Sequence, residues 1–352
     1  MQNWEELIFS DLPFKEKAQR VFEHQYAHNP VYRRFCDALN DKPGPENPNG
    51  DDFEELLDQS FHDAQLKFPL LPVRAFKDVD VFTREEENSE LKTQNSQLIF
   101  KSSGTSTMER STHHVPDEEL YRRSIFEGFK TFYDLNNAVI LGYMPGYSEN
   151  SQSSLIWMIN ELITHDEIKK SRFLPLGKPL NQAEIDDIAA AGKQIIIFGA
   201  AFGLVDLVEI SSVDLPSNSI IIETGGMKTH QREMGRITMH RRLAEGFSID
   251  ISRIHSEYGM CELLSQAYTT GGKWFRSVPW MQVSVRNPEN PQQTLPPHKE
   301  GLIGIIDLAN VHSCSFLLTG DRGMMDEQGR FQVLGRWQPN DLRGCNFLIN
   351  ED

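Results

Sequence analysis

Continuous apolar runs, separated by helical patterns, dominate the middle of the chain. Residues 138–141, 194–198 and 219–222 are rich in β-branched side chains, and each run leads toward a glycine. Runs of this length suit strands that are buried on both faces of a sheet. Between the first two runs, residues 155–162 carry apolar side chains at helical spacing. Alternating strands and helices predict an α/β fold.

The two ends of the chain follow different patterns. Residues 1–95 are mostly polar with helical spacing, and a loop rich in Pro, Asn and Gly interrupts them at 42–50. Later, hydrophobic and polar residues alternate at 281–285, and the segment 301–308 is apolar. Residues 326–329, Asp-Glu-Gln-Gly, predict a hairpin turn. We therefore expect a helical N-terminal region and a β-rich C-terminal subdomain.

Composition and charge exclude several classes of protein. The 352 residues are 39% hydrophobic, and the net charge of −16 argues against a broad nucleic-acid or anionic-membrane surface. The N-terminus lacks the pattern of a signal peptide, and no apolar run approaches the ~18 residues of a membrane helix. The 4 cysteines form no Cys-x-x-Cys pair. These features predict a cytoplasmic protein with no membrane span and no nucleic-acid partner.

A loop rich in hydroxyl side chains follows a short strand predicted at residues 98–100. Its residues are Lys101, Ser102, Ser103, Gly104, Thr105, Ser106 and Thr107. Gly104 lets the backbone turn and approach a ligand, and the hydroxyl and backbone N–H groups can donate to phosphate oxygens. Lys101 adds positive charge. We interpret the loop as a phosphate-binding site, although an ordinary Ser/Thr-rich turn has the same composition.

Two further segments combine glycine with a candidate ligand group. The run at 219–222 leads into Gly225 and Gly226, and Asp321 lies in the segment 318–323, for which we predict a turn. Glycines let a ligand approach the backbone, and a carboxylate can accept hydrogen bonds from ribose hydroxyls. A strand-to-helix turn and an ordinary β-turn aspartate are the respective alternatives.

An aromatic ring, a glycine and a carboxylate lie close together at residues 258–262. The segment consists of Tyr258, Gly259, Met260, Cys261 and Glu262. A carboxylate at this point can hold Mg²⁺, which prefers oxygen ligands and commonly bridges to substrate phosphates. A helix-capping or surface glutamate is the alternative for Glu262.

In this order, the segments resemble the adenylate-forming superfamily, which includes acyl-CoA ligases and nonribosomal adenylation domains. The matching segments are residues 102–106 (phosphate loop), 225–226 (adenine-flanking glycines), 258–262 (Tyr-Gly-x-Thr-Glu, with cysteine for threonine), 319–321 (ribose-binding Thr-Gly-Asp) and 334–336 (hinge Gly-Arg). The resemblance implies the α/β N-terminal domain fold of these enzymes. It also implies that ATP and Mg²⁺ are required, and that a carboxylic acid is activated as its adenylate.

A closer resemblance is to the acyl-protein synthetases, the LuxE-type component of bacterial fatty acid reductase. It rests on Phe-Lys-Ser-Ser-Gly-Thr-Ser at 100–106, Glu-Thr-Gly-Gly-Met-Lys at 223–228 and Tyr-Gly-Met-x-Glu-Leu at 258–263. In that family a cysteine near the C-terminus takes the acyl group as a thioester and passes it on, and Cys345 matches it in position and context. The resemblance implies a fatty acid substrate and an acyl-accepting partner, either a reductase or a carrier protein.

The segment after the predicted hinge is short. The superfamily continues into a mobile domain whose lysine serves adenylation, whereas residues 336–352 contain no lysine. We therefore expect an adenylation domain over residues 1–335, with the mobile domain largely missing. Lys101, Lys228, Arg336 or a partner protein is expected to supply the missing cation.

The residues alone leave other roles and functions open. Cys345 suits a nucleophile toward an acyl-adenylate, but a free cysteine also packs as a small hydrophobic residue. We expect structural roles for Cys261, Cys314, His113, His114 and His255. The same segments also fit a ligase that transfers acyl groups to CoA or a carrier protein without Cys345. The missing lysine favours a third possibility, a nucleotide-binding protein with impaired catalysis.

Overall fold

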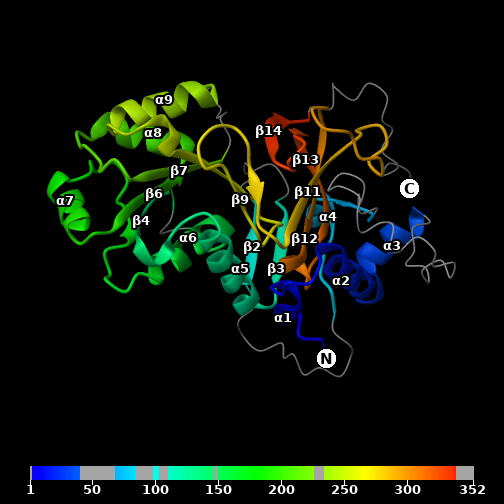
Figure 1. Ribbon diagram of the computed structural model, residues 1–352. Coiled ribbons are helices and arrows are strands. Elements are labelled where there is room, and N and C mark those ends of the chain that lie inside the picture. Colours follow the sequence, from blue (N-terminus) through cyan, green and yellow to red (C-terminus); the bar gives the residue numbers. More distant parts are fainter. Residues whose placement is uncertain are drawn as a thin grey trace. The chain divides into compact units, whose positions relative to one another are not determined.

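The chain forms two compact units. The structure is a computed structural model that describes residues 2–39, 68–84, 98–102, 110–144, 146, 150–225 and 234–337 (Figure 1). The first unit comprises Met1–Leu98, Ser111–Asp117 and Pro279–Asp352, and the second comprises Ile99–Arg110 and Glu118–Val278. Within the described ranges, no helix combines the length and the apolar character needed to cross a membrane.

A seven-stranded sheet forms the centre of the second unit. Its strands are β4 (Ala138–Tyr143), β5 (Arg172–Phe173), β6 (Gln194–Ala200), β7 (Ile220–Thr224), β8 (Ile254–Tyr258), β9 (Ala267–Tyr268) and β10 (Arg276–Ser277). The order is β10-β9-β8-β7-β6-β4-β5, with parallel pairing from β8 to β5 and antiparallel pairing of β9 and β10. Every residue of β4, β7 and β8 is buried, as expected when helices cover both faces of a parallel sheet.

Helices cover the two faces of this sheet. They are α5 (Glu118–Lys130), α6 (Ser154–Thr164), α7 (Gln182–Ala190), α8 (Ala201–Ile210) and α9 (Arg236–Gly246), with the short helices η2 (Leu135–Asn137) and η3 (Ile251–Arg253). Helices α7, α8 and α9 share one apolar core with Ile221 and Ile254 of the sheet. The next residue of β8, His255, points to the opposite face and contacts Tyr133, just beyond α5.

The secondary structure predicted for this unit is confirmed. The apolar runs at 138–141, 194–198 and 219–222 form most of β4, β6 and β7. The helical stripe at 155–162 lies in α6, whose buried residues are Met158, Ile159 and Leu162, and the Ser153 side chain caps its first turn. The apolar segment at 98–100 lies in β2 (Leu98–Lys101).

The first unit combines N-terminal helices with a second sheet. The helices are α1 (Trp4–Ile8), α2 (Phe14–His28), α3 (Pro30–Ala38), α4 (Ala75–Asp78) and η4 (Leu308–Asn310). The strands are β1 (Leu71–Pro72), β3 (Thr112–Val115), β11 (Met281–Arg286), β12 (Gly301–Asp307), β13 (Phe316–Met325) and β14 (Phe331–Arg336). The sheet runs β1-β13-β12-β11, and β14 pairs with β13. The described part of the N-terminal region contains α1 to α4, and the β-rich C-terminal subdomain of the predicted fold is confirmed.

The sequence prediction is right for one turn of this unit and wrong for another. Gly329, with φ +74°, donates its N–H to the Asp326 carbonyl at 3.2 Å, so the turn predicted at 326–329 is present between β13 and β14. The turn predicted at 318–323 is wrong, because these residues lie inside β13. Pairing with β12 and β14 overrides the turn preference of Thr-Gly-Asp.

Buried polar side chains of this unit bond to one another and to backbone. The Gln25 amide of α2 donates to the Asn310 and Val311 carbonyls at 3.0 and 2.8 Å, and accepts from the Ser315 N–H at 3.0 Å. His113 Nε2 lies 3.0 Å from Asn310 Oδ1. A buried polar group is stable only when it is hydrogen-bonded, so this arrangement agrees with a structural role for His113.

Candidate active site

Two of the predicted ligand-binding segments lie side by side at the carboxyl edge of the seven-stranded sheet. β7 ends at Thr224 and runs into Gly225, and β8 ends at Tyr258 and runs into Gly259. Thr224 and Glu257 are direct neighbours in the parallel register. Ligands of open α/β sheets bind outside the carboxyl ends of the strands. The structure thus brings the two segments together where this architecture places its ligands.

The backbone at Gly225 leaves room for a ligand. Its φ of +96° is a conformation that favours glycine, and an added Cβ would meet nothing within 4 Å. Gly226 and residues 103–107 of the predicted phosphate loop lie outside the described residues, as does Cys345. Lys101 is exposed at the end of β2, next to Ser102, and its N–H donates to the Gln152 carbonyl at 2.9 Å.

On the α9 face of the sheet, a buried carboxylate gathers three polar groups. Glu223 Oε1 accepts from Ser256 Oγ at 2.5 Å and lies 3.3 Å from His240 Nε2. Arg236 Nε lies 3.5 Å from the same oxygen as an ion pair, too poorly aligned for a hydrogen bond. Ser256 Oγ and His240 Nε2 also approach each other to 3.5 Å. One imidazole nitrogen faces both Glu223 and Ser256, and Glu223, Ser256 and His240 are all buried. The set therefore anchors β7 and β8 to α9 rather than forming a nucleophilic triad.

On the opposite face, a second buried carboxyl group joins the two segments. Thr224 Oγ1 donates to Glu257 Oε2, and Oε1 would lie 2.5 Å from a Cβ added to Gly259. Burial raises the pKa of Glu257 to about 7; the Thr224 hydrogen bond opposes this shift and the charge of Glu223 adds to it. An alanine at position 259 would therefore require the Glu257 carboxyl group to shift.

The rest of the Tyr258–Glu262 segment carries an aromatic ring and a second carboxylate. The Tyr258 ring packs edge-on against Phe275 with centroids 6.0 Å apart, and Met260 is half-buried. Glu262 is buried, and burial raises the pKa of the neighbouring Cys261 thiol. A thiol with a raised pKa is a weak nucleophile, in agreement with a structural role for Cys261.

Glu262 can contribute one carboxylate ligand to a magnesium site. In the ranges that the structure describes, no three His, Cys, Asp or Glu side chains are grouped as metal ligands. Mg²⁺ usually keeps several waters and binds one or two carboxylates together with substrate phosphates. A single glutamate therefore suffices as the protein's contribution to a phosphate-bridged ion.

In the first unit, the structure pairs two further predicted residues. Asp321 of β13 and Arg336 of β14 are direct neighbours in the antiparallel register, and Arg336 Nε lies 3.0 Å from Asp321 Oδ1. The Asp321 N–H donates to Thr319 Oγ1 at 3.1 Å. The Arg336 side chain remains 74% exposed while Asp321 is largely buried. An exposed guanidinium held by a fixed carboxylate is suited to meet an anionic ligand.

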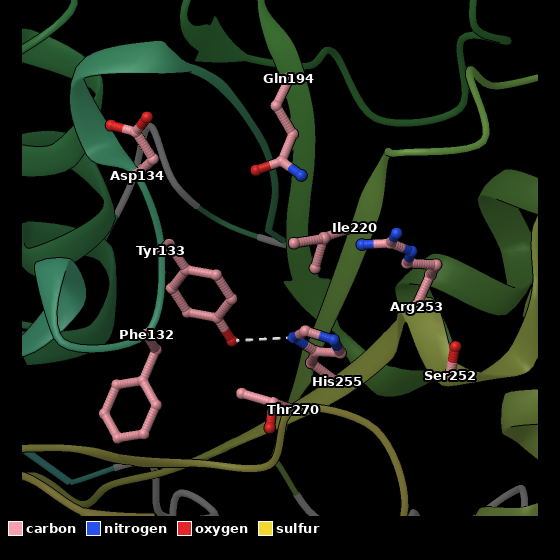
Figure 2. A pocket seen from close by; sticks show the side chains of 9 residues that line it. All are labelled: Phe132, Tyr133, Asp134, Gln194, Ile220, Ser252, Arg253, His255 and Thr270. Atoms are coloured by element: carbon pink, nitrogen blue, oxygen red, sulfur yellow. Dashed lines mark hydrogen bonds between the residues drawn. The ribbon is translucent and has the colours of Figure 1, made fainter.

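A pocket of about 410 Å³ lies at the other edge of the seven-stranded sheet, near the amino ends of its parallel strands (Figure 2). Its lining residues are Phe132, Tyr133, Asp134, Gln194, Ile220, Ser252, Arg253, His255 and Thr270. Of these lining residues, Tyr133 and His255 contact each other, with Oη 3.1 Å from Nδ1, and burial lowers the pKa of His255 to about 4. The pocket holds none of the predicted ligand residues, and His255 is a paired, uncharged core histidine, as expected.

Sequence reasoning missed the two buried glutamates of the carboxyl edge. Glu223 follows the apolar run of β7, and Glu257 lies in the fully buried β8. A charged residue inside a strand buried on both faces is a signal in itself, because such a group needs a partner or a shifted pKa. The partners, however, come from strands and a helix that are distant in the sequence.

Several solved structures resemble this chain. The fold matches a 2-hydroxyisobutyryl-CoA ligase in complex with 2-HIB-AMP and CoA, with a TM-score of 0.58, 14% identity, 92% of this chain covered and 69% of that chain. For MatB from Rhodopseudomonas palustris, bound to ATP, the TM-score is 0.48 and the identity 15%, with 68% of this chain and 47% of that chain covered. For a luciferase-like enzyme from the mealworm Zophobas morio, the TM-score is 0.48 and the identity 17%, with 68% of this chain and 57% of that chain covered. The chain spans about half the length of the latter two relatives. The CoA ligase match confirms the predicted fold class.

The sequence itself matches one protein family. No curated protein matches the chain. Residues 164–352, which include β7, β8 and the whole of the β11–β14 region, match the model described as acyl-protein synthetase, LuxE. The chain belongs to the LuxE acyl-protein synthetase family.

Proposed function

We propose that this protein activates a carboxylic acid with ATP, forming an acyl-adenylate and pyrophosphate. The observation that carries the proposal is the placement of Thr224–Gly225 beside Tyr258–Gly259 at the carboxyl edge, in a chain of the LuxE family. A carboxylate oxygen of the acid attacks the α-phosphorus of ATP. A new O–P bond forms, the bond to the bridging oxygen breaks, and pyrophosphate leaves with that electron pair. The reaction needs positioning and charge stabilisation more than a protein base.

Each predicted residue then has a role in that step. The loop Ser102, Ser103, Gly104, Thr105, Ser106 and Thr107 binds phosphate oxygens. The adenine is flanked by Gly225, Gly226, Tyr258, Gly259 and Met260. Asp321 accepts from the ribose hydroxyls, while Lys101 and Arg336 stabilise the charge on the phosphate chain. The exposure of both cations in the structure supports this last assignment.

Magnesium is the expected companion of ATP in this site. When bound, Mg²⁺ would neutralise negative charge on the phosphate chain. Glu262 is the carboxylate that we assign to it. Its burial next to the Tyr258–Gly259 turn supports the assignment, since a buried carboxylate is favoured by a cation.

The second step of the proposal is acyl transfer to Cys345. The thiolate attacks the carbonyl carbon of the acyl-adenylate, a thioester bond forms, and AMP leaves with the electron pair of the broken C–O bond. The thiol proton goes to solvent. The acyl group then passes to an acyl-accepting protein, a reductase or a carrier. We propose that the acid from which it comes is a fatty acid. Membership of the LuxE family supports this sequence of steps.

ATP–pyrophosphate exchange over a panel of fatty and aryl acids tests the first step. We expect exchange with at least one fatty acid, dependent on Mg²⁺. Glu184→Gln, on the exposed face of α7, changes a carboxylate that pairs with Arg172, and this variant is expected to exchange like wild type. Absence of exchange with every acid, in protein shown to be folded and to bind AMP, overturns the activity.

Intact-mass analysis tests the transfer step. Wild type incubated with ATP and acid is expected to carry a hydroxylamine-sensitive acyl adduct that Cys345→Ala lacks. Cys314→Ala is the control, because this buried thiol has a raised pKa and is not expected to react. An adduct that persists in Cys345→Ala removes this cysteine from the mechanism. AMP release that depends on CoA in the same variant would indicate a CoA ligase instead.

A further inference from the structure

The buried carboxyl group of Glu257 has no place in the adenylation chemistry, yet it contacts both ligand segments of the carboxyl edge. It accepts the hydroxyl hydrogen bond of Thr224, the residue directly before Gly225. Its other oxygen lies against the backbone of Gly259, where an added Cβ would approach it to 2.5 Å. Only 8% of the residue is exposed. One side chain therefore fixes the end of β7 relative to the turn that follows β8.

We propose that Glu257 is a positioning residue that holds Thr224–Gly225 and Tyr258–Gly259 at the spacing required by the nucleotide. The inference rests on the proposed function, because it assigns these two segments to ATP. Glu257 acts through Thr224 and the Gly259 backbone and does not touch the reacting atoms. A buried hydrogen bond of this kind restricts two chain segments that the sequence separates widely.

The link that Glu257 makes between Thr224–Gly225 and Tyr258–Gly259 is called the clamp below. The contacts on the opposite face of the sheet explain why it depends on Glu257. Glu223 is the neighbour of Thr224 along β7, and its bonds go to Ser256 and His240 on the α9 side. Side chains alternate between the faces of a strand, so Glu223 cannot hold the groups on the α5 side. In the described residues, the Thr224 hydroxyl bonds to Glu257. The two carboxyl groups thus secure the same pair of strands from opposite sides.

The surroundings of Glu257 disfavour its ionised form. The titratable and charged groups that face it or act on it are Glu223 from β7, His255 from β8, Tyr268 from β9, Tyr133 beyond α5 and, through Tyr133, Arg276. None of these contributes a cation in direct contact, and burial holds His255 uncharged near neutral pH. Ionisation above pH 7 therefore adds a negative charge beside Glu223 and close to the segments that we assign to anionic AMP. This charge disfavours AMP binding, although the carboxylate accepts the Thr224 hydrogen bond more strongly than the neutral acid does.

Isothermal titration of AMP into the full-length protein tests the clamp. We expect Thr224→Val and Glu257→Ala each to weaken AMP binding about five- to tenfold, as for the loss of one buried hydrogen bond. The double variant is expected to be no weaker than Glu257→Ala alone, because both changes break the same link. Glu257→Gln keeps an acceptor of the same size and is expected to restore affinity to within about twofold.

The pH dependence separates positioning from general destabilisation. The affinity of wild type for AMP, relative to that of Glu257→Gln, is expected to fall as the pH rises from 6 to 8.5, since only the wild-type carboxyl group titrates at this position. Titration of the AMP phosphate affects both proteins alike and cancels in the ratio. Glu184→Gln on the exposed face of α7 is expected to follow wild type.

Three outcomes overturn the inference. They are wild-type affinity in Glu257→Ala, additive losses in the double variant, and a Glu257→Gln profile that titrates like wild type. A wild type that binds AMP but exchanges no pyrophosphate overturns the proposed activity alone, because the clamp is measured by AMP binding. A wild type that binds no AMP overturns both.

Discussion

The two edges of the seven-stranded sheet differ in how they use buried polar groups. At the amino edge, the Tyr133–His255 pair lines a pocket of about 410 Å³, and both groups are uncharged near neutral pH (Figure 2). At the carboxyl edge, Glu223 and Glu257 are buried on opposite faces and tie the ends of β7 and β8 together. The pocket and the two buried carboxyl groups thus lie at opposite ends of the same strands.

The difference shows that a cavity alone is weak evidence for the reacting site. The volume of a pocket shows only where side chains leave space. Buried ionisable groups have an unfavourable desolvation free energy, and such groups cluster at functional sites. In open α/β sheets the carboxyl ends of the strands hold the ligands. Two of the predicted segments, at Gly225 and at Tyr258–Gly259, lie at that edge. Substitutions at the carboxyl edge should therefore reduce pyrophosphate exchange much more than substitutions at the amino edge.

The largest effect is expected for Gly259→Ala at the carboxyl edge. Its Cβ would meet the Glu257 carboxyl at 2.5 Å, and burial and the Thr224 bond prevent that group from moving away cheaply. Overpacking of this kind costs about 1–3 kcal/mol. We expect pyrophosphate exchange to fall by about a hundredfold, since a displaced Tyr258–Gly259 turn loses its alignment.

Gly235→Ala is the matched control for this variant. Gly235 precedes α9, has an ordinary φ of −69°, and an added Cβ would meet nothing within 4 Å. Thermal unfolding and exchange should both stay close to wild type. Equal losses in the two variants would contradict the close approach at Gly259.

The next largest effect concerns the pH dependence of stability. The pKa of Glu257 is raised from its usual 4.5 to about 7, so the folded protein binds more protons than the unfolded chain between these values. Stability therefore decreases as the pH rises from about 4.5 to 7, by about 2 kcal/mol for this group. We expect urea unfolding to show that Glu257→Gln gains stability relative to wild type across this window.

Glu184→Gln is the control, since its carboxylate is exposed on α7. A constant difference between wild type and Glu257→Gln from pH 4.5 to 7.5 would show that Glu257 ionises normally in the folded protein.

Much of the sheet was predictable because local patterns determine its strands and helix stripe. The run at 194–198 and the stripe at 155–162 need only side-chain periodicity, and both are confirmed. The turn predicted at 318–323 was wrong because strand pairing on both sides of β13 decides its conformation. The charge of Asp321 is met by Arg336, which only the β13–β14 register brings close.

The candidate site was predictable in its glycine and aromatic positions but not in its buried support. Gly225 and Tyr258 stand in recognisable motifs, whereas the Thr224–Glu257 bond depends on the parallel register of two strands that are far apart in the sequence. The face on which each glutamate lies follows from the alternation of side chains only once that register is known. Sequence patterns specify the elements, and pairing between distant elements specifies the network.

A smaller effect is expected for Tyr133→Phe at the amino edge. The change removes the hydroxyl that lies 3.1 Å from His255 Nδ1 and leaves a buried ring nitrogen without that partner. The free energy of unfolding is expected to fall by about 1 kcal/mol. AMP affinity and exchange should stay within about twofold of wild type, as for a change outside the reacting site. A tenfold loss of exchange at unchanged AMP affinity would tie the amino edge to the reaction.

The smallest effect, and the sharpest test of the comparison, is expected for Arg253→Gln in the pocket. Arg253 is half-exposed, and its guanidinium makes no hydrogen bond or ion pair in the part of the chain that the structure describes. Loss of a solvated charge of this kind usually changes stability by less than about 0.5 kcal/mol. Thermal unfolding, AMP affinity and pyrophosphate exchange should therefore all match wild type. A large loss of exchange in Arg253→Gln, with Gly259→Ala fully active, would reverse the assignment of the two edges.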